Sequence, residues 1–220
     1  MLSIFANYFV YERYYANVID VETTIKPNNI KMITSTGILL ALEIVFQIIG
    51  NYVSLGPVSI NLSLIPIAVG AILYGPLVGG FLGLANGILV ILAPATLSLF
   101  MSISVWGTIL TCLLKCTIAG VAAGFFFKLF KNHKVVGGVI TSFLVPIINT
   151  GLFSISCLTI FRSFLEENYA NQGFGNIYLF LILGVIGWNF LLEMGITGIL
   201  SYPVSRALFK FQDNIAREED

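Results

Sequence analysis

Apolar residues fill most of the chain between residues 33 and 209, in runs long enough to cross a lipid bilayer. About 20 apolar residues span the hydrocarbon core as a helix. The pattern therefore predicts an all-α integral membrane protein with six transmembrane helices, expected at residues 32–50, 60–73, 76–92, 104–127, 137–161 and 176–208. These spans make up a transmembrane domain, residues 32–210, between an N-terminal segment, residues 1–31, and a tail, residues 211–220.

Composition supports a membrane protein. Of 220 residues, 57% are hydrophobic and 10% are charged, whereas a soluble domain carries roughly 25% charged residues. The formal net charge is zero, so there is no electrostatic footprint for nucleic acid. The three cysteines lie in apolar runs, where we expect them to be small buried fillers. We expect no metal and no cofactor.

The basic residues indicate the orientation. With six spans, most lysines and arginines fall on one side of the membrane, at Lys26, Lys31, Lys128, Lys131, Lys134, Arg206, Lys210 and Arg217. The opposite loops hold Arg162, which Glu166 and Glu167 offset. The positive-inside rule then places both termini in the cytoplasm. Residues 1–31 are rich in aromatic side chains, and we expect them to lie in the cytoplasm or at the membrane surface.

Five polar side chains interrupt the apolar runs, namely Glu43, Lys115, Asn149, Asn189 and Glu193. A charged group at the bilayer centre costs about 2.5–3.5 kcal/mol on insertion scales, so it normally faces a partner, a cavity or a ligand. A helix rises about 1.5 Å per residue, which places Lys115, Asn149 and Asn189 at similar depths. We therefore expect these three side chains to meet near the middle of the membrane.

A proline adds to this polar layer. Pro146 removes a backbone hydrogen bond beside Asn149, and such an opening is tolerated at membrane depth where it lines a cavity. We predict a site for a polar solute, formed by Lys115, Asn149, Asn189, Glu193, Thr111 and Trp106. The alternative is that Lys115 pairs with Glu193 or Glu43 only to bury both charges.

Small residues recur at four-residue spacing along two spans. The third span carries Gly75, Gly79, Gly83 and Gly87, and the first span carries Gly37 and Ala41. Such positions let helix backbones approach closely, and they serve either internal packing or the docking of another membrane protein. The outer loop at residues 93–103 is unusually apolar. It is either a distorted start of the fourth span or a segment that folds back over a cavity.

Sequence motifs of common enzymes are missing. The chain has no phosphate-binding loop of the form Gly-x-x-x-x-Gly-Lys-Ser/Thr, no His-Glu-x-x-His and no Gly-x-Ser-x-Gly. We therefore do not expect this chain to be an enzyme.

A known family shares several of these features. A short apolar span, a Gly-Pro turn and a glycine-laddered span make up residues 60–92, INLSLIPIAVGAILYGPLVGGFLGLANGILVIL, and the later spans contain WGTILTCLLKCTIAGVAAG and PIINTGLF. On these residues the chain resembles, over about residues 32–210, the S components. These are the substrate-binding subunits of energy-coupling-factor (ECF) transporters for vitamins and related micronutrients. The aromatic N-terminal segment departs from the family's usual short start.

The resemblance implies a six-helix S-component bundle with a solute pocket toward the outer face, built from spans four to six and the outer loops. It implies capture of a small water-soluble vitamin or micronutrient outside a bacterial plasma membrane, and its delivery inward. The partners would be a transmembrane scaffold subunit, docked at Gly37 and Ala41, and two cytoplasmic ATPase subunits. Two alternatives stay open: a stand-alone small secondary transporter or channel, and a structural or assembly membrane protein.

Overall fold

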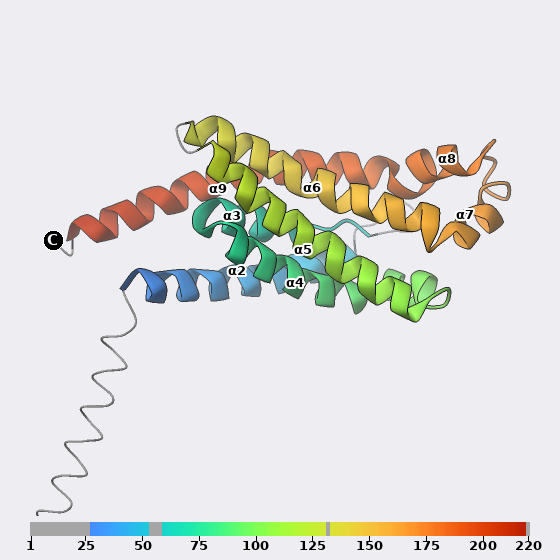
Figure 1. Ribbon diagram of the computed structural model, residues 1–220, viewed down its shortest axis with the longest axis horizontal. Coiled ribbons are helices and arrows are strands. Elements are labelled where there is room, and N and C mark those ends of the chain that lie inside the picture. Colours follow the sequence, from blue (N-terminus) through green and yellow to red (C-terminus); the bar gives the residue numbers. More distant parts are fainter. Residues whose placement is uncertain (1–26, 53–58, 131–132, 219–220) are drawn as a thin grey trace, which may run out of the picture. The chain divides into compact units, whose positions relative to one another are not determined.

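The computed structural model describes residues 27–52, 59–130 and 133–218 (Figure 1). These residues form α-helices, two π-helical stretches and short connections, with no β-strand among them. Most of the N-terminal segment and part of the first outer loop lie outside the described residues. The chain divides into two compact units, Met1–Gly37 and Ile38–Asp220, and the second holds every feature of the site described below.

Each predicted span corresponds to a helix, and most boundaries agree within a few residues. The helices are α2 (Pro27–Asn51), α3 (Leu64–Tyr74), α4 (Pro76–Ile91), α5 (Val105–Leu129), α6 (Lys134–Thr159) and α9 (Gly187–Glu218). The short helices α7 (Arg162–Asn168) and α8 (Ile177–Leu179) and the π-helices η1 (Thr96–Phe100) and η2 (Phe180–Ile186) stand between them.

Four helical segments of the described chain are long and apolar enough to cross a membrane, at Ile30–Asn51, Val105–Leu129, Lys134–Thr159 and Ile177–Ala207. The helices α3 and α4 have only 11 and 16 residues. At 1.5 Å per residue they are about 16 and 24 Å long, which is shorter than a hydrocarbon core of about 30 Å. Helix length thus supports four spans, and the count of six stays a prediction, as does the cytoplasmic location of the termini.

The helices α3 and α4 form a tightly turned pair. Gly75 joins them with φ 87°, a backbone conformation that glycine adopts without a steric cost. Pro76 starts α4, where its fixed φ suits the first turn and its missing N–H is not needed. The side chains of α3 are buried from Leu64 to Ile72. The turn predicted from the sequence is therefore present, and α3 is packed inside its unit.

The glycine ladder of α4 packs against α5. A Cβ atom built on Gly79 would lie 2.5 Å from the carbonyl oxygen of Gly120, and one on Gly87 would lie 2.8 Å from that of Cys112. Real Cβ atoms do not approach an oxygen so closely, so only glycine allows this helix spacing. The contacts with α5 therefore favour internal packing as the role of the ladder.

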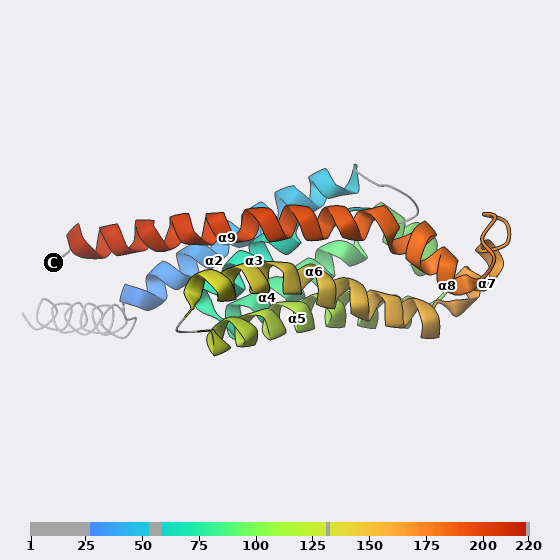
Figure 2. The ribbon, with the colours of Figure 1, turned by 90° about the horizontal axis from the view of Figure 1, so that it is seen from above.

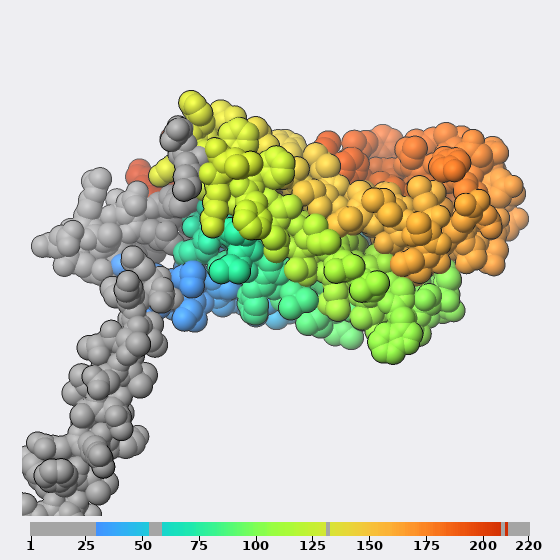
Figure 3. All heavy atoms as spheres, viewed as in Figure 1, coloured from blue at the N-terminus to red at the C-terminus, as the bar shows by residue number. Residues whose placement is uncertain are grey.

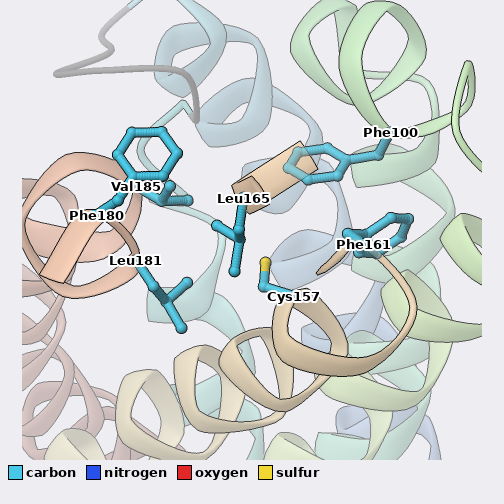
Figure 4. Packing of buried hydrophobic residues seen from close by; sticks show 7 residues of the cluster. All are labelled: Phe100, Cys157, Phe161, Leu165, Phe180, Leu181 and Val185. Carbon is cyan, nitrogen blue, oxygen red and sulfur yellow. The ribbon is translucent and has the colours of Figure 1, made fainter. Parts of the chain in front are cut away.

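One end of the second unit is closed by apolar side chains. Figures 1 and 2 show α7 and α8 together at the end where α5 begins and α6 ends. Seven side chains from this region form one buried cluster (Figure 4), namely Phe100, Cys157, Phe161, Leu165, Phe180, Leu181 and Val185. Phe100 belongs to η1, so the apolar segment 93–103 folds back onto the helices and does not extend α5.

The predicted sixth span is interrupted. The sequence predicts one helix over residues 176–208, and one helical segment does run from Ile177 to Ala207. Within it, however, η2 separates α8 from α9, and Gly187 at the end of η2 has φ 7° and ψ −109°. A π-helical stretch widens the helix by one residue per turn and often marks a functional region. The interruption ends two residues before Asn189.

The outer surface of the second unit is largely apolar. Large side chains on three helices stay exposed, including Leu110 at 54%, Ile155 at 59% and Ile199 at 67%. The space-filling view shows α4, α5 and α6 side by side on one face of the molecule (Figure 3). Such a surface is expected where lipid, and not water, surrounds the helices.

Candidate functional site

A pocket lies between α5, α6, η1, η2 and α9, with further residues from α2, from α4 and from the segment before α3. Its empty space is about 770 Å³, counting the part that opens to solvent. Five of the six side chains predicted to bind solute line it, namely Thr111, Lys115, Asn149, Asn189 and Glu193. The structure therefore brings together Lys115, Asn149 and Asn189, which the sequence places at similar depths in the membrane.

Trp106 is not part of this pocket. Its side chain is 82% exposed at the first turn of α5, and Tyr178 and Trp188 are exposed as well. Amphipathic aromatic rings gather where a membrane meets water, which accounts for the exposed rings of Trp106 and Tyr178 at the end of the helices where α5 begins. The prediction that Trp106 faces the solute therefore lacks support in the geometry.

Lys115 is the cation of the pocket. Its side chain is buried on α5, and its Nζ lies 4.9 Å from the ring centroid of Phe153. A cation over an aromatic face is attracted by the ring quadrupole. Among the described residues, Lys115 forms no ion pair within 4.0 Å with Glu43 or Glu193. The alternative that Lys115 pairs with a carboxylate therefore has no close ion pair to support it in the described structure, and the role of Lys115 stays a prediction.

Glu193 is the carboxylate of the pocket. Its Oε1 accepts a hydrogen bond of 2.7 Å from the backbone N–H of Asn61. A backbone donor and a carboxylate form a strong, short contact. This contact ties α9 to the segment that leads into α3, and it fixes the position of one carboxylate oxygen at the pocket wall.

Glu43 lies outside the pocket. It is fully buried on α2, and neither of its carboxyl oxygens has a hydrogen-bond partner in the described structure. One turn further along, Gln47 does line the pocket, and its Oε1 accepts a hydrogen bond of 3.2 Å from the Ser63 hydroxyl. The polar stripe of α2 therefore reaches the pocket through Gln47 and not through Glu43.

A chain of weak hydrogen bonds holds Asn149. The Asn86 side-chain amide donates to Cys116 Sγ, and the Cys116 thiol donates to Asn149 Oδ1, each at 3.5 Å. Sulfur is a weak donor and acceptor, but both contacts are buried and limit rotation of the carboxamide. Pro146 lies three residues earlier, and α6 continues through it. Cys116 thus acts as a buried filler that also orients a pocket residue.

Aromatic rings form the apolar part of the pocket wall, from Phe100, Phe153, Phe161 and Phe190. The ring of Phe100 meets those of Phe153 and Phe161 edge-on, with centroids 5.6 and 5.0 Å apart. Such edge-to-face pairs are a preferred aromatic arrangement, so they hold each other in place. The wall combines fixed apolar rings with amide, hydroxyl and charged groups.

Sequence reasoning missed several polar residues of the wall, among them Gln47, Asn61, Thr96 and Thr108. For two of them, the sequence contains a pattern that could have indicated a place in the pocket wall. Gln47 follows Glu43 by four residues, which places both on one helix face, and Asn61 directly precedes the short third helix. Thr96 and Thr108 could not have been identified from the sequence, because single threonines are common in apolar helices.

The comparison with protein families identifies the chain. A family model described as the substrate-specific component of ECF transporters matches residues 31–205. The chain belongs to this family. It is a substrate-binding membrane subunit of an ECF transporter and not an enzyme, and family membership implies a small-molecule substrate and association with a transmembrane (T) subunit and ATPase subunits. The comparison with curated proteins finds no match.

Family membership changes how the pocket is interpreted. The pocket residues from Gln47 to Glu193 all lie within the matched range. A buried charge without a close partner is unfavourable in a protein that only needs to be stable, but it is useful in a substrate-binding subunit. The pocket is therefore the candidate substrate site of this S component.

Proposed function

We propose that this S component captures a small water-soluble vitamin or related micronutrient from the outer side of a bacterial plasma membrane. Delivery inward is driven by a T subunit and two ATPase subunits. The observation that carries the proposal is Lys115, a buried cation that lines the pocket and lacks an ion pair with Glu43 or Glu193. A charge-assisted contact from its ammonium to a carboxylate or phosphate would compensate the cost of burying it.

The placement of the pocket supports uptake from outside. Phe100 of η1 and Phe161, next to α7, line it, so it lies toward the end of the helices where α7 and α8 gather. The basic residues Lys128 and Lys134 stand at the opposite ends of α5 and α6. With the basic end in the cytoplasm, the pocket would face outward, and both termini would be cytoplasmic.

Binding is tested with protein purified in a mild detergent or in lipid nanodiscs. We expect a small molecule to stay bound through purification, and to be released and identified by mass spectrometry after denaturation. Preparations that repeatedly carry no small molecule, and that none of the soluble vitamins stabilises against heat, would contradict the proposal.

Docking of the T subunit is proposed at Gly37 and Ala41, which are both exposed on α2. Small residues permit close approach of a partner helix, so Gly37→Trp or Ala41→Trp should block co-purification with the T and ATPase subunits and leave solute binding unchanged. Gly151→Trp is the matched control, because Gly151 is an exposed glycine on α6. Normal assembly of both α2 variants would place the docking surface elsewhere.

A further inference from the structure

The pocket holds a basic and an acidic side chain that form no close ion pair with each other in the described structure. Lys115 and Glu193 both line it, and they interact electrostatically. However, they are not within the 4.0 Å of an ion pair in the described structure. The two charges come from different helices, α5 and α9, so the arrangement is a property of the fold and not of one helix face.

Each charge has a partner that satisfies it only in part. Lys115 faces the ring of Phe153 at 4.9 Å, and a ring offers no lone pair to any of the three ammonium N–H groups. Glu193 accepts one hydrogen bond, from the backbone of Asn61 at 2.7 Å, whereas a carboxylate has about four acceptor positions. Buried charges need pairing and further hydrogen bonds, so both groups have capacity left for a ligand.

On this basis we infer that the solute itself carries both signs, with a carboxylate or phosphate bound by Lys115 and a protonated amine bound by Glu193. The inference rests on the proposed function, since it concerns the substrate of the same pocket. The substrate class is then a small zwitterion.

The remaining wall fits the middle of such a solute. Phe100, Phe153 and Phe161 line the pocket, and the ring of Phe100 packs edge-on against each of the other two, so an apolar body can lie against them. Thr111 has a hydroxyl without a hydrogen-bond partner in the described structure, and it stands one helical turn from Lys115. That hydroxyl can donate a second hydrogen bond to the anionic end of the solute.

A solute with only a negative charge fits less well. Its anionic group would satisfy Lys115, but it would leave the Glu193 carboxylate buried in the same pocket with a second negative charge nearby. Like charges in one buried site disfavour each other strongly. A solute with only a positive charge has the corresponding problem at Lys115. A zwitterion is the class of solute that compensates both buried charges.

The test uses matched probes on the purified full-length protein in nanodiscs, with ligand removed by repeated exchange. The panel contains the free amino acids and phosphoethanolamine as zwitterions. It also contains the N-acetyl derivative of each amino acid as the anion-only partner, and the methyl ester as the cation-only partner. The panel also includes pantothenate, folate and riboflavin, which have no zwitterionic end. Binding is measured by the shift in melting temperature and then by calorimetry.

We expect at least one zwitterion to bind about tenfold or more tightly than both of its derivatives, because each derivative lacks one charge-assisted contact. In Glu193→Gln the advantage over the N-acetyl derivative should disappear while the advantage over the ester remains. In Lys115→Met the reverse should hold. Thr141→Val, a fully buried substitution outside the pocket, is the folding control and should keep both advantages.

Two results would overturn the inference and leave the proposed function intact. One is that an N-acetyl derivative, pantothenate, folate or riboflavin binds while no zwitterion does. The other is that Glu193→Gln binds the preferred zwitterion as tightly as the unmodified protein. Binding of no compound in the panel would also count against the inference, whereas the proposed function fails only if no small molecule co-purifies and no soluble vitamin stabilises the protein.

Discussion

Replacing Lys115 by methionine removes the charge from the pocket and nearly preserves the length of the side chain. A hydrogen bond to a charged group contributes about 1.5–3 kcal/mol, which corresponds to roughly 10- to 150-fold in affinity. Because Lys115 lines the pocket and has no ion pair with Glu43 or Glu193, we expect solute binding to weaken by this amount.

Protein stability should respond less than binding. Breaking a buried ion pair costs about 3–5 kcal/mol, because one charge is left without its partner. The substitution breaks no such pair in the described structure, and what it removes is the contact of the Lys115 ammonium with the Phe153 ring and its longer-range attraction to Glu193. That contact contributes about 0.5–2 kcal/mol, so the Lys115→Met variant should fold and melt close to the unmodified protein.

The assay compares the dissociation constant of the solute identified by mass spectrometry with the melting temperature measured in the same nanodiscs. Lys128→Met is the control, because it makes the same chemical change on an exposed residue of α5 outside the pocket. Unchanged affinity in Lys115→Met would refute a role in binding. A variant that fails to fold would show that Lys115 is a structural partner of a carboxylate.

Three further predictions address the packing and the orientation. Glu43→Met should leave the melting temperature unchanged or raise it, because it removes two buried carboxyl oxygens that have no partner in the described structure; a large drop would reveal an essential contact of that carboxyl. Gly83→Ala should destabilise the protein by about 1–3 kcal/mol, because its Cβ would overlap the backbone of α5, whereas Gly151→Ala, with open space around it, should be neutral or slightly stabilising in the same thermal melts. A membrane-impermeant thiol reagent added outside should label a cysteine placed at Gln172 and should not label one placed at His133. The background should be low, because the three native cysteines are buried. The reverse labelling would contradict cytoplasmic termini.

Much of the helical architecture could be predicted from the sequence, because apolar run length and glycine or proline turns act locally. The Gly75-Pro76 turn is an example, since glycine permits the φ of 87° and proline suits the first turn of α4. The interruption at η2 could not be predicted. Its sequence, FLILGVI, is as apolar as the helices around it, and the packing of Phe180 and Val185 in a cluster with α6 and η1 is a tertiary effect.

The part of the candidate site that depends only on depth in the membrane could be predicted from the sequence. Lys115, Asn149 and Asn189 meet because residues at equal depth on neighbouring helices come close. Trp106 is predicted because its ring could stack on a solute and not because of its depth, and in the structure this exposed side chain is not part of the pocket wall. Depth does not distinguish Glu193, which lines the pocket, from Glu43, which does not.

The most direct test of a solute-binding pocket at Lys115 is native mass spectrometry of the mildly purified protein beside its Lys115→Met variant. We expect the unmodified protein to carry the added mass of one small molecule, and the variant to appear mainly without it. An unmodified protein that carries no added mass, or a variant that retains the same mass to the same extent, would contradict the account.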